Sequence, residues 1–128
     1  MSIGIVEVSV DNQMRAVAFC TGVLGLTLKA HGQYGAADRW ISVVSAEDVD
    51  GTEVHLAPIN AAAAALRQWR RETGSPAESF ATDDLWRDYQ QLRARGVDFV
   101  MESTGGLHGT DVVFEDGCGT PLNLHADA

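Results

Sequence analysis

The sequence is poor in cysteine and has no long apolar run. Its two cysteines, Cys20 and Cys118, are too few for a disulfide framework, so we expect reduced thiols in a cytoplasmic protein. No stretch approaches the ~18 apolar residues of a membrane-spanning helix. The first residues, Met1–Gly4, lack the basic start and apolar middle of a signal peptide. We therefore expect no membrane partner.

Basic residues are also scarce. The chain has 9 Lys and Arg against 18 Asp and Glu, which gives a formal net charge of −9. From Gly96 to the end there is no Lys or Arg at all. Because nucleic-acid phosphates are bound by basic surfaces, we expect no nucleic-acid partner. With 128 residues, 45% of them hydrophobic, the chain is long and apolar enough for one globular domain with its own core.

A short pattern occurs twice and organises the chain. Gly51–Leu56 and Gly119–Leu124 both read Gly-Thr-x-apolar-x-Leu. In each, apolar residues at every second place predict a strand with one face toward the core. The opposite face carries His55 in the first copy and Asn123 in the second. We expect this second face to be enclosed, so the repeat places one ligand-capable side chain at corresponding points of two halves.

The elements around the repeat also occur twice, each time in the order βαβββ. The sequence predicts an α+β fold, in which two βαβββ modules form a mixed, cup-shaped sheet with helices outside. Module one covers about 1–59, a connector helix about 60–74, and module two about 75–128. Ser103–Gly109 is interpreted as a loop. The predicted strands are 3–10, 26–30, 40–44, 53–57, 78–82, 97–101, 112–114 and 122–124, and the two module helices follow the capping residues Asn12 and Asp84.

The order and spacing of these features resemble the vicinal oxygen chelate superfamily. That family includes glyoxalases, extradiol dioxygenases, fosfomycin-resistance enzymes and bleomycin-binding proteins. The resemblance covers nearly the whole chain and is carried by Val10–Ala16 with Phe19 and Val23–Gly25, by Phe80–Leu85, by Leu92 with Ala94–Val97, and by Phe114, Asp116 and Gly119. Because this fold supports several chemistries and some non-enzymes, the resemblance implies a fold and leaves the function open.

The resemblance also implies four positions at which metal-using members place their ligands. In this sequence they fall on Ile5, His55, Ala77 and Asn123. Ile5 and Ala77 have hydrocarbon side chains and cannot bind a metal, whereas such sites normally need three protein ligands. We therefore expect no metal or other cofactor, although a divalent metal at a displaced site formed by Glu7, His55 and His125 is the alternative.

Five residues are the candidates for binding a small molecule: Glu7, Trp40, Glu53, His55 and Asn123. Glu7 and His55 are also the candidate catalytic residues, as an acid–base pair. The competing interpretation is that His55 is a core histidine and Trp40 a packing residue. His31 and His108 are interpreted as solvated loop histidines.

Three functions fit these residues. The first is a protein that binds and sequesters a small organic molecule, such as an antibiotic or a metabolite, in a cup lined by a homodimer. The second is a glyoxalase-like or dioxygenase-like lyase, isomerase or oxygenase with a displaced metal. The third is a metal-free enzyme in which Glu7 and His55 move a proton. We expect a homodimer because open sheets leave edge strands that favour pairing with a second copy.

Overall fold

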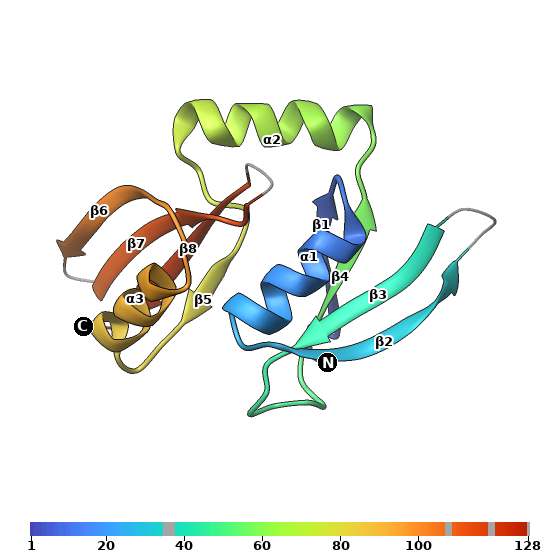
Figure 1. Ribbon diagram of the computed structural model, residues 1–128, viewed down its shortest axis with the longest axis horizontal. Coiled ribbons are helices and arrows are strands. Elements are labelled where there is room, and N and C mark those ends of the chain that lie inside the picture. Colours follow the sequence, from blue (N-terminus) through green and yellow to red (C-terminus); the bar gives the residue numbers. More distant parts are fainter. Residues whose placement is uncertain (35–37, 107–108, 118–119, 128) are drawn as a thin grey trace. The chain divides into compact units, whose positions relative to one another are not determined.

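The computed structural model describes residues 1–34, 38–106, 109–117 and 120–127 (Figure 1). The chain forms two compact units, Met1–Ala63 and Ala64–Ala128. Each unit has a four-stranded sheet and one helix between its first two strands. The predicted α+β class with two βαβββ modules is thus confirmed, with one separate sheet in each module.

The first unit is a mixed sheet in the order β1-β4-β3-β2. Strands β1 and β4 are parallel, and the other neighbours are antiparallel. Its elements are β1 (Ile5–Val10), helix α1 (Gln13–Ala18), the π-helical turn η1 (Phe19–Val23), β2 (Thr27–Tyr34), β3 (Asp38–Val44) and β4 (Glu53–Pro58).

Helix α1 covers one face of this sheet (Figure 1). It begins where the sequence predicts, because the Asn12 side chain accepts a hydrogen bond of 3.0 Å from the Arg15 backbone N–H. The stretch ends at Gly25, whose φ of 75° lies in the left-handed region that favours glycine. The core under the helix is made by Val8, Val10, Ala16, Ile41, Val43 and Leu56.

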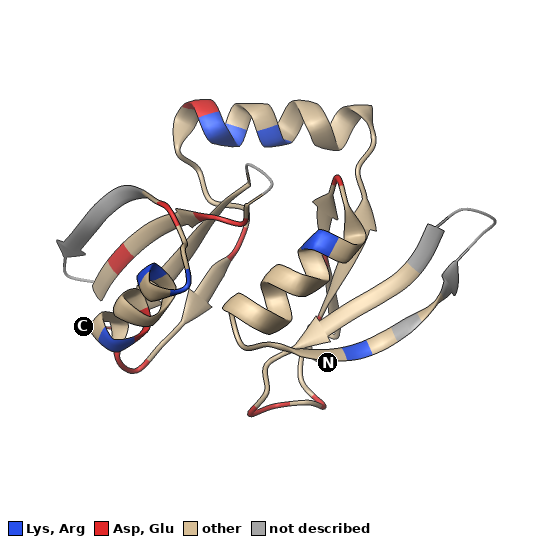
Figure 2. Ribbon diagram, viewed as in Figure 1, with Lys and Arg blue, Asp and Glu red and all other residues tan. Residues whose placement is uncertain are grey.

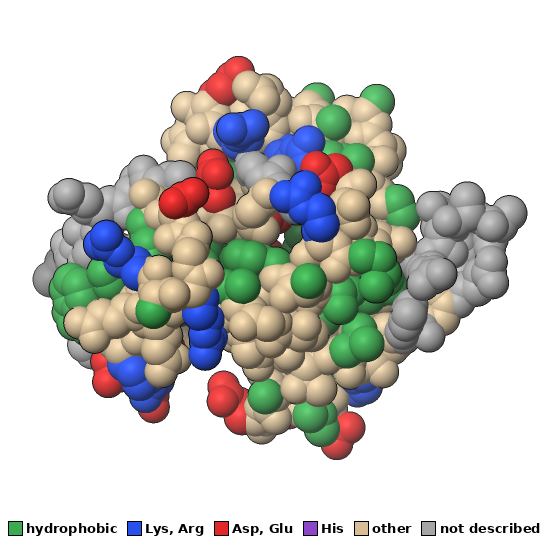
Figure 3. Space-filling view, viewed as in Figure 1, with side chains coloured by type: hydrophobic (Ala, Val, Ile, Leu, Met, Phe, Trp, Pro, Cys, Tyr) green, Lys and Arg blue, Asp and Glu red, His purple; other side chains and the backbone are tan. Residues whose placement is uncertain are grey.

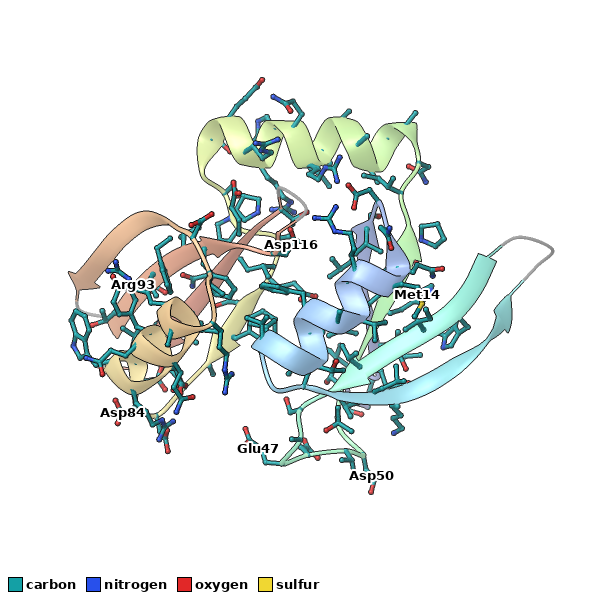
Figure 4. The ribbon with its side chains drawn as sticks, in the orientation of Figure 1. Met14, Glu47, Asp50, Asp84, Arg93 and Asp116 are labelled. Atoms are coloured by element: carbon teal, nitrogen blue, oxygen red, sulfur yellow. The ribbon has the colours of Figure 1, made fainter. Side chains whose placement is uncertain are left out.

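The second unit repeats this topology in the order β5-β8-β7-β6. Asp84, labelled in Figure 4, caps the helix of this unit. Its side chain accepts a hydrogen bond of 3.1 Å from the Arg87 backbone N–H. The buried apolar residues include Leu85, Leu92, Val112, Phe114, Leu122 and Leu124. The elements are α2 (Ala61–Thr73), which begins in the first unit, then β5 (Ser79–Ala81), α3 (Leu85–Ala94), β6 (Phe99–Gly106), β7 (Gly109–Glu115) and β8 (Pro121–Ala126).

Two local predictions are wrong. The segment predicted as a loop, Ser103–Gly109, is largely strand, because β6 continues to Gly106 and β7 begins at Gly109. His31 lies within β2, paired with Ile41, and not in a loop. In both places, pairing with the neighbouring strand overrides the local preference of glycine for turns. His108, Cys118 and Gly119 lie outside the described residues.

The acidic excess is visible at the turn between β3 and β4 (Figure 2). Glu47, Asp48 and Asp50 are all exposed there. Glu47 and Asp50 point away from the strands (Figure 4), and acidic side chains project at this edge in the space-filling view (Figure 3). The only nearby ion pair among the described residues joins Lys29 Nζ to Asp50 Oδ1 at 4.0 Å. These carboxylates face solvent and therefore act on solubility rather than on a site.

Within the part of the chain that the structure describes, no helix is both long and apolar enough to span a lipid bilayer.

One carboxyl group of the second unit is mostly buried. Glu78 precedes β5, and strand alternation places it on the face of Phe80, the face that carries apolar side chains. Burial disfavours the ionised form and raises the pKa of Glu78 from its ordinary 4.5 to about 7. The carboxyl of Glu78 is therefore largely neutral in the folded protein below neutral pH.

We predict that Glu78 makes the protein less stable as pH rises. In the unfolded chain the carboxyl ionises near 4.5, whereas in the folded chain it ionises near 7, so stability is lost between these values. Replacing Glu78 with Gln should remove this loss and raise the free energy of unfolding at pH 8 by up to about 3 kcal/mol. Urea unfolding at pH 4.5 and pH 8 measures the difference.

Glu47→Gln is the matched control, because it removes one carboxylate from an exposed turn. This variant should leave unchanged the difference in the free energy of unfolding between pH 4.5 and pH 8. An equal effect of the two variants would contradict the assignment to Glu78.

Candidate functional site

The register of the first sheet brings three polar residues together. Glu7 of β1 lies opposite His55 of β4, and Ser42 of β3 lies opposite His55 on the other side. Their neighbours along the strands, such as Val8 and Leu56, point to the core under α1. Because side chains alternate along a strand, the polar residues share the face that α1 does not cover. We call this the polar face of the first sheet; it also includes Trp40 and Glu53.

His55 is held on this face by contacts from both neighbouring strands. The Trp40 ring stacks on the imidazole, with ring centroids 3.8 Å apart and planes at 16°. The Nδ1 atom lies 3.4 Å from Glu7 Oε1, and the exposed fractions of the two side chains are 7% and 63%. A buried imidazole is thus placed between an aromatic ring and a carboxylate that reaches solvent.

Ser42 and Glu53 form a second pair on the polar face. The Ser42 hydroxyl donates a hydrogen bond of 2.7 Å to Glu53 Oε1. Ser42 is fully buried, so its hydroxyl needs such a partner. Ser42 was not predicted from the sequence, although its place two residues after Trp40, on the same strand face, was a usable signal.

The second sheet has a polar group of its own around Asn123. The amide Nδ2 donates to Ser79 Oγ at 2.9 Å and to Asp111 Oδ1 at 2.8 Å. Asp111 Oδ1 also lies 2.8 Å from His125 Nδ1, and His125 Nε2 lies 3.1 Å from Asp127 Oδ1. Ser79 and Asp111 were not found from the sequence. They lie on strands whose register with β8 no local pattern reveals.

This arrangement shifts two ionisation equilibria. Hydrogen bonds from Asn123 and then from His125 lower the pKa of the Asp111 carboxyl. Hydrogen bonds to Asp111 and then to Asp127 raise the pKa of His125. Both ring nitrogens of His125 are therefore occupied by contacts with these two carboxylates.

Two buried atoms lack a hydrogen-bond partner in the described part of the chain, His55 Nε2 and Asn123 Oδ1. They occupy corresponding places, because Glu7 faces His55 as Ser79 faces Asn123. Leaving a buried acceptor unpaired costs roughly 1–3 kcal/mol, so each such atom calls for an explanation.

The residues present do not fit the metal site of metal-using relatives. Ile5 and Ala77 stand at two of the four implied positions and offer only hydrocarbon. Among the described residues, no group of three or more His, Cys, Asp or Glu side chains is placed to hold a metal ion. Of the alternative set, Glu7 and His55 belong to the first unit and His125 to the second. The expected absence of a metal stays a prediction.

Comparison with known proteins establishes the family. Residues 2–124 match the Glyoxalase/Bleomycin resistance protein/Dioxygenase superfamily, and the chain belongs to it. A relative from Bacillus subtilis (strain 168), the uncharacterized protein YurT, is 34% identical over 127 residues, covering 97% of this chain and 98% of YurT. The family suggested by the sequence resemblance is thus confirmed.

Two solved structures show the same fold. UcmS2 has a TM-score of 0.82 at 24% identity, covering 98% of this chain and 97% of its own. TnmS3, an antibiotic binding protein from Streptomyces sp. CB03234, has a TM-score of 0.78 at 23% identity, covering 100% of this chain and 97% of its own. At such identities these likenesses establish the fold alone.

Proposed function

We propose that this protein binds and sequesters a small organic molecule, an antibiotic or a metabolite, on the polar face of the first sheet. The observation that carries the proposal is His55, which is buried, stacked on Trp40 and placed beside Glu7, and whose Nε2 has no hydrogen-bond partner among the described residues. Binding sites combine apolar and aromatic walls with a few placed polar groups. The similarity to TnmS3, itself an antibiotic binding protein, agrees with this function.

The charges on this face favour a neutral or cationic ligand. Glu7 and Glu53 lie on it, and neither β1 nor β4 contains a Lys or Arg. An anion would be desolvated against like charge, whereas a cation would be attracted. An aromatic part of the ligand would gain from contact with Trp40, and a cationic part would gain roughly 0.5–2 kcal/mol from its ring.

We also propose that a second copy of the chain completes the binding site on the polar face of the first sheet. In the first sheet β1 and β2 are edge strands, and β1 carries exposed apolar residues at Ile5 and Val6. Exposed apolar edges favour association with another copy. Sedimentation at micromolar concentration should give the mass of a dimer; a monomer would remove the second copy from the proposal.

A second candidate function is an enzyme that uses Glu7 and His55 as an acid–base pair. The specific observation in its favour is the 3.4 Å approach of Glu7 Oε1 to His55 Nδ1, which resembles the carboxylate–imidazole pairing of general bases. A displaced metal that uses the same two residues belongs to this candidate too.

The ligand preference gives the first test. In a library of mixed charge, screened by thermal shift and confirmed by calorimetry, the hits should be chiefly neutral or cationic aromatic compounds. Glu7→Gln should weaken the cationic hits roughly 3- to 10-fold, because it removes one partly solvated carboxylate. Glu47→Gln, which removes a carboxylate from the exposed β3–β4 turn, should leave their affinity unchanged. Hits that are chiefly anions would contradict the proposal.

Product and metal analysis separates binding from catalysis. A sequestered ligand should be recovered chemically unchanged after long incubation, as mass spectrometry would show, and elemental analysis should find no stoichiometric transition metal. Conversion that is lost in His55→Ala would instead support the enzyme. About one zinc, iron, nickel or manganese per chain, also lost in His55→Ala, would support the displaced metal site.

A further inference from the structure

The contacts of His55 define which of its nitrogens carries a proton. Its Nδ1 lies 3.4 Å from Glu7 Oε1, and an ionised carboxylate can only accept hydrogen bonds. Of the two tautomers of an uncharged imidazole, this contact therefore favours the one with its proton on Nδ1. The other nitrogen, Nε2, then carries no proton and is a buried acceptor.

No neighbouring hydroxyl or amide satisfies that acceptor within the described residues. The Ser42 hydroxyl lies on the next strand, but its proton is committed to Glu53 at 2.7 Å. The Trp40 ring covers the flat side of the imidazole and holds its plane. Turning the ring out of this plane would lose the Trp40 contact, and turning it over within the plane would move Nδ1 away from Glu7.

In the second unit, the side chain at the corresponding place is also oriented by its donor contacts. Asn123 donates both of its amide hydrogen bonds, to Ser79 and to Asp111, and this fixes its orientation. Its Oδ1 is left as a buried acceptor without a partner among the described residues. In each unit, a residue of the first strand thus orients the side chain opposite it on the last strand: Glu7 orients His55, and Ser79 orients Asn123. The acceptor atom of each oriented side chain has no partner among the described residues.

We infer that His55 Nε2 accepts a hydrogen bond from the bound molecule, so that the ligand is an aromatic compound bearing a hydroxyl or ammonium donor. This inference rests on the proposed binding function and names the chemistry of its ligand. A donor on the ligand would satisfy a buried atom that has no partner in the described part of the chain, and a compound of the same shape without the donor would not. Glu7 acts here as a positioning residue, which sets the tautomer of His55.

The tautomer can be tested without any ligand. In ¹⁵N-labelled protein, at a pH where the His55 ring is uncharged, long-range ¹H–¹⁵N spectra should show a protonated Nδ1 and an unprotonated Nε2. Glu7→Gln should reduce the share of this tautomer, because an amide no longer demands a donor, whereas Glu47→Gln should not. A proton found on Nε2 in the unaltered protein would overturn the inference.

A matched pair of probes tests the acceptor role directly. 2-Naphthol and 2-methoxynaphthalene share one ring system, and only the naphthol has a donor. By calorimetry the naphthol should bind about tenfold more tightly, the ratio expected for one buried hydrogen bond. In His55→Phe, which keeps a ring for Trp40 to contact, the ratio should fall to about one. Should this variant not fold, Glu7→Gln should reduce the same ratio.

The outcomes separate the inference from the function on which it rests. Equal binding of the two probes to the unaltered protein would overturn the acceptor role and leave the binding function standing. A tenfold preference that persists in His55→Phe would also overturn it. If neither probe nor any library compound binds, the binding function itself fails, and the inference fails with it.

Discussion

The arrangement of the first unit depends on the two-residue period of β4. Leu56 packs into the core under α1. Because side chains alternate along a strand, this contact determines the direction of all the remaining side chains of β4. His55 is consequently directed to the opposite face, between Glu7 of β1 and Ser42 of β3. A slip of one residue would expose the apolar set and bury the wrong side chains. Core packing on one face of the sheet therefore positions the polar group on the other.

The polar face is costly to maintain, which is the physical reason to assign it a function. Ser42 and His55 are buried on it, and buried polar groups are stabilising only when they are paired. Ser42 has its partner in Glu53, whereas His55 Nε2 has none among the described residues. If this side chain served only for packing, an apolar residue could fill the place without the cost of burying an unsatisfied polar atom. In the proposed function, the bound molecule would supply the missing hydrogen bond, and this would account for the histidine.

The sequence predicted the fold well because its signals are local. Alternation in the two Gly-Thr-x-apolar-x-Leu segments, and the caps Asn12 and Asp84, depend only on nearby residues. The position of His55 on the face opposite Leu56 was predicted for the same reason, since it follows from the alternation of a single strand.

What the sequence could not predict depends on cross-strand register. Ser42, Ser79 and Asp111 join the polar groups only through pairing with β4 or β8.

The central claim is that the bound molecule lies on the polar face of the first sheet. A crystal structure of the protein with its tightest library compound tests this most directly. The account predicts a ligand in contact with Trp40 and His55; a ligand seated elsewhere, with both residues untouched, would contradict it.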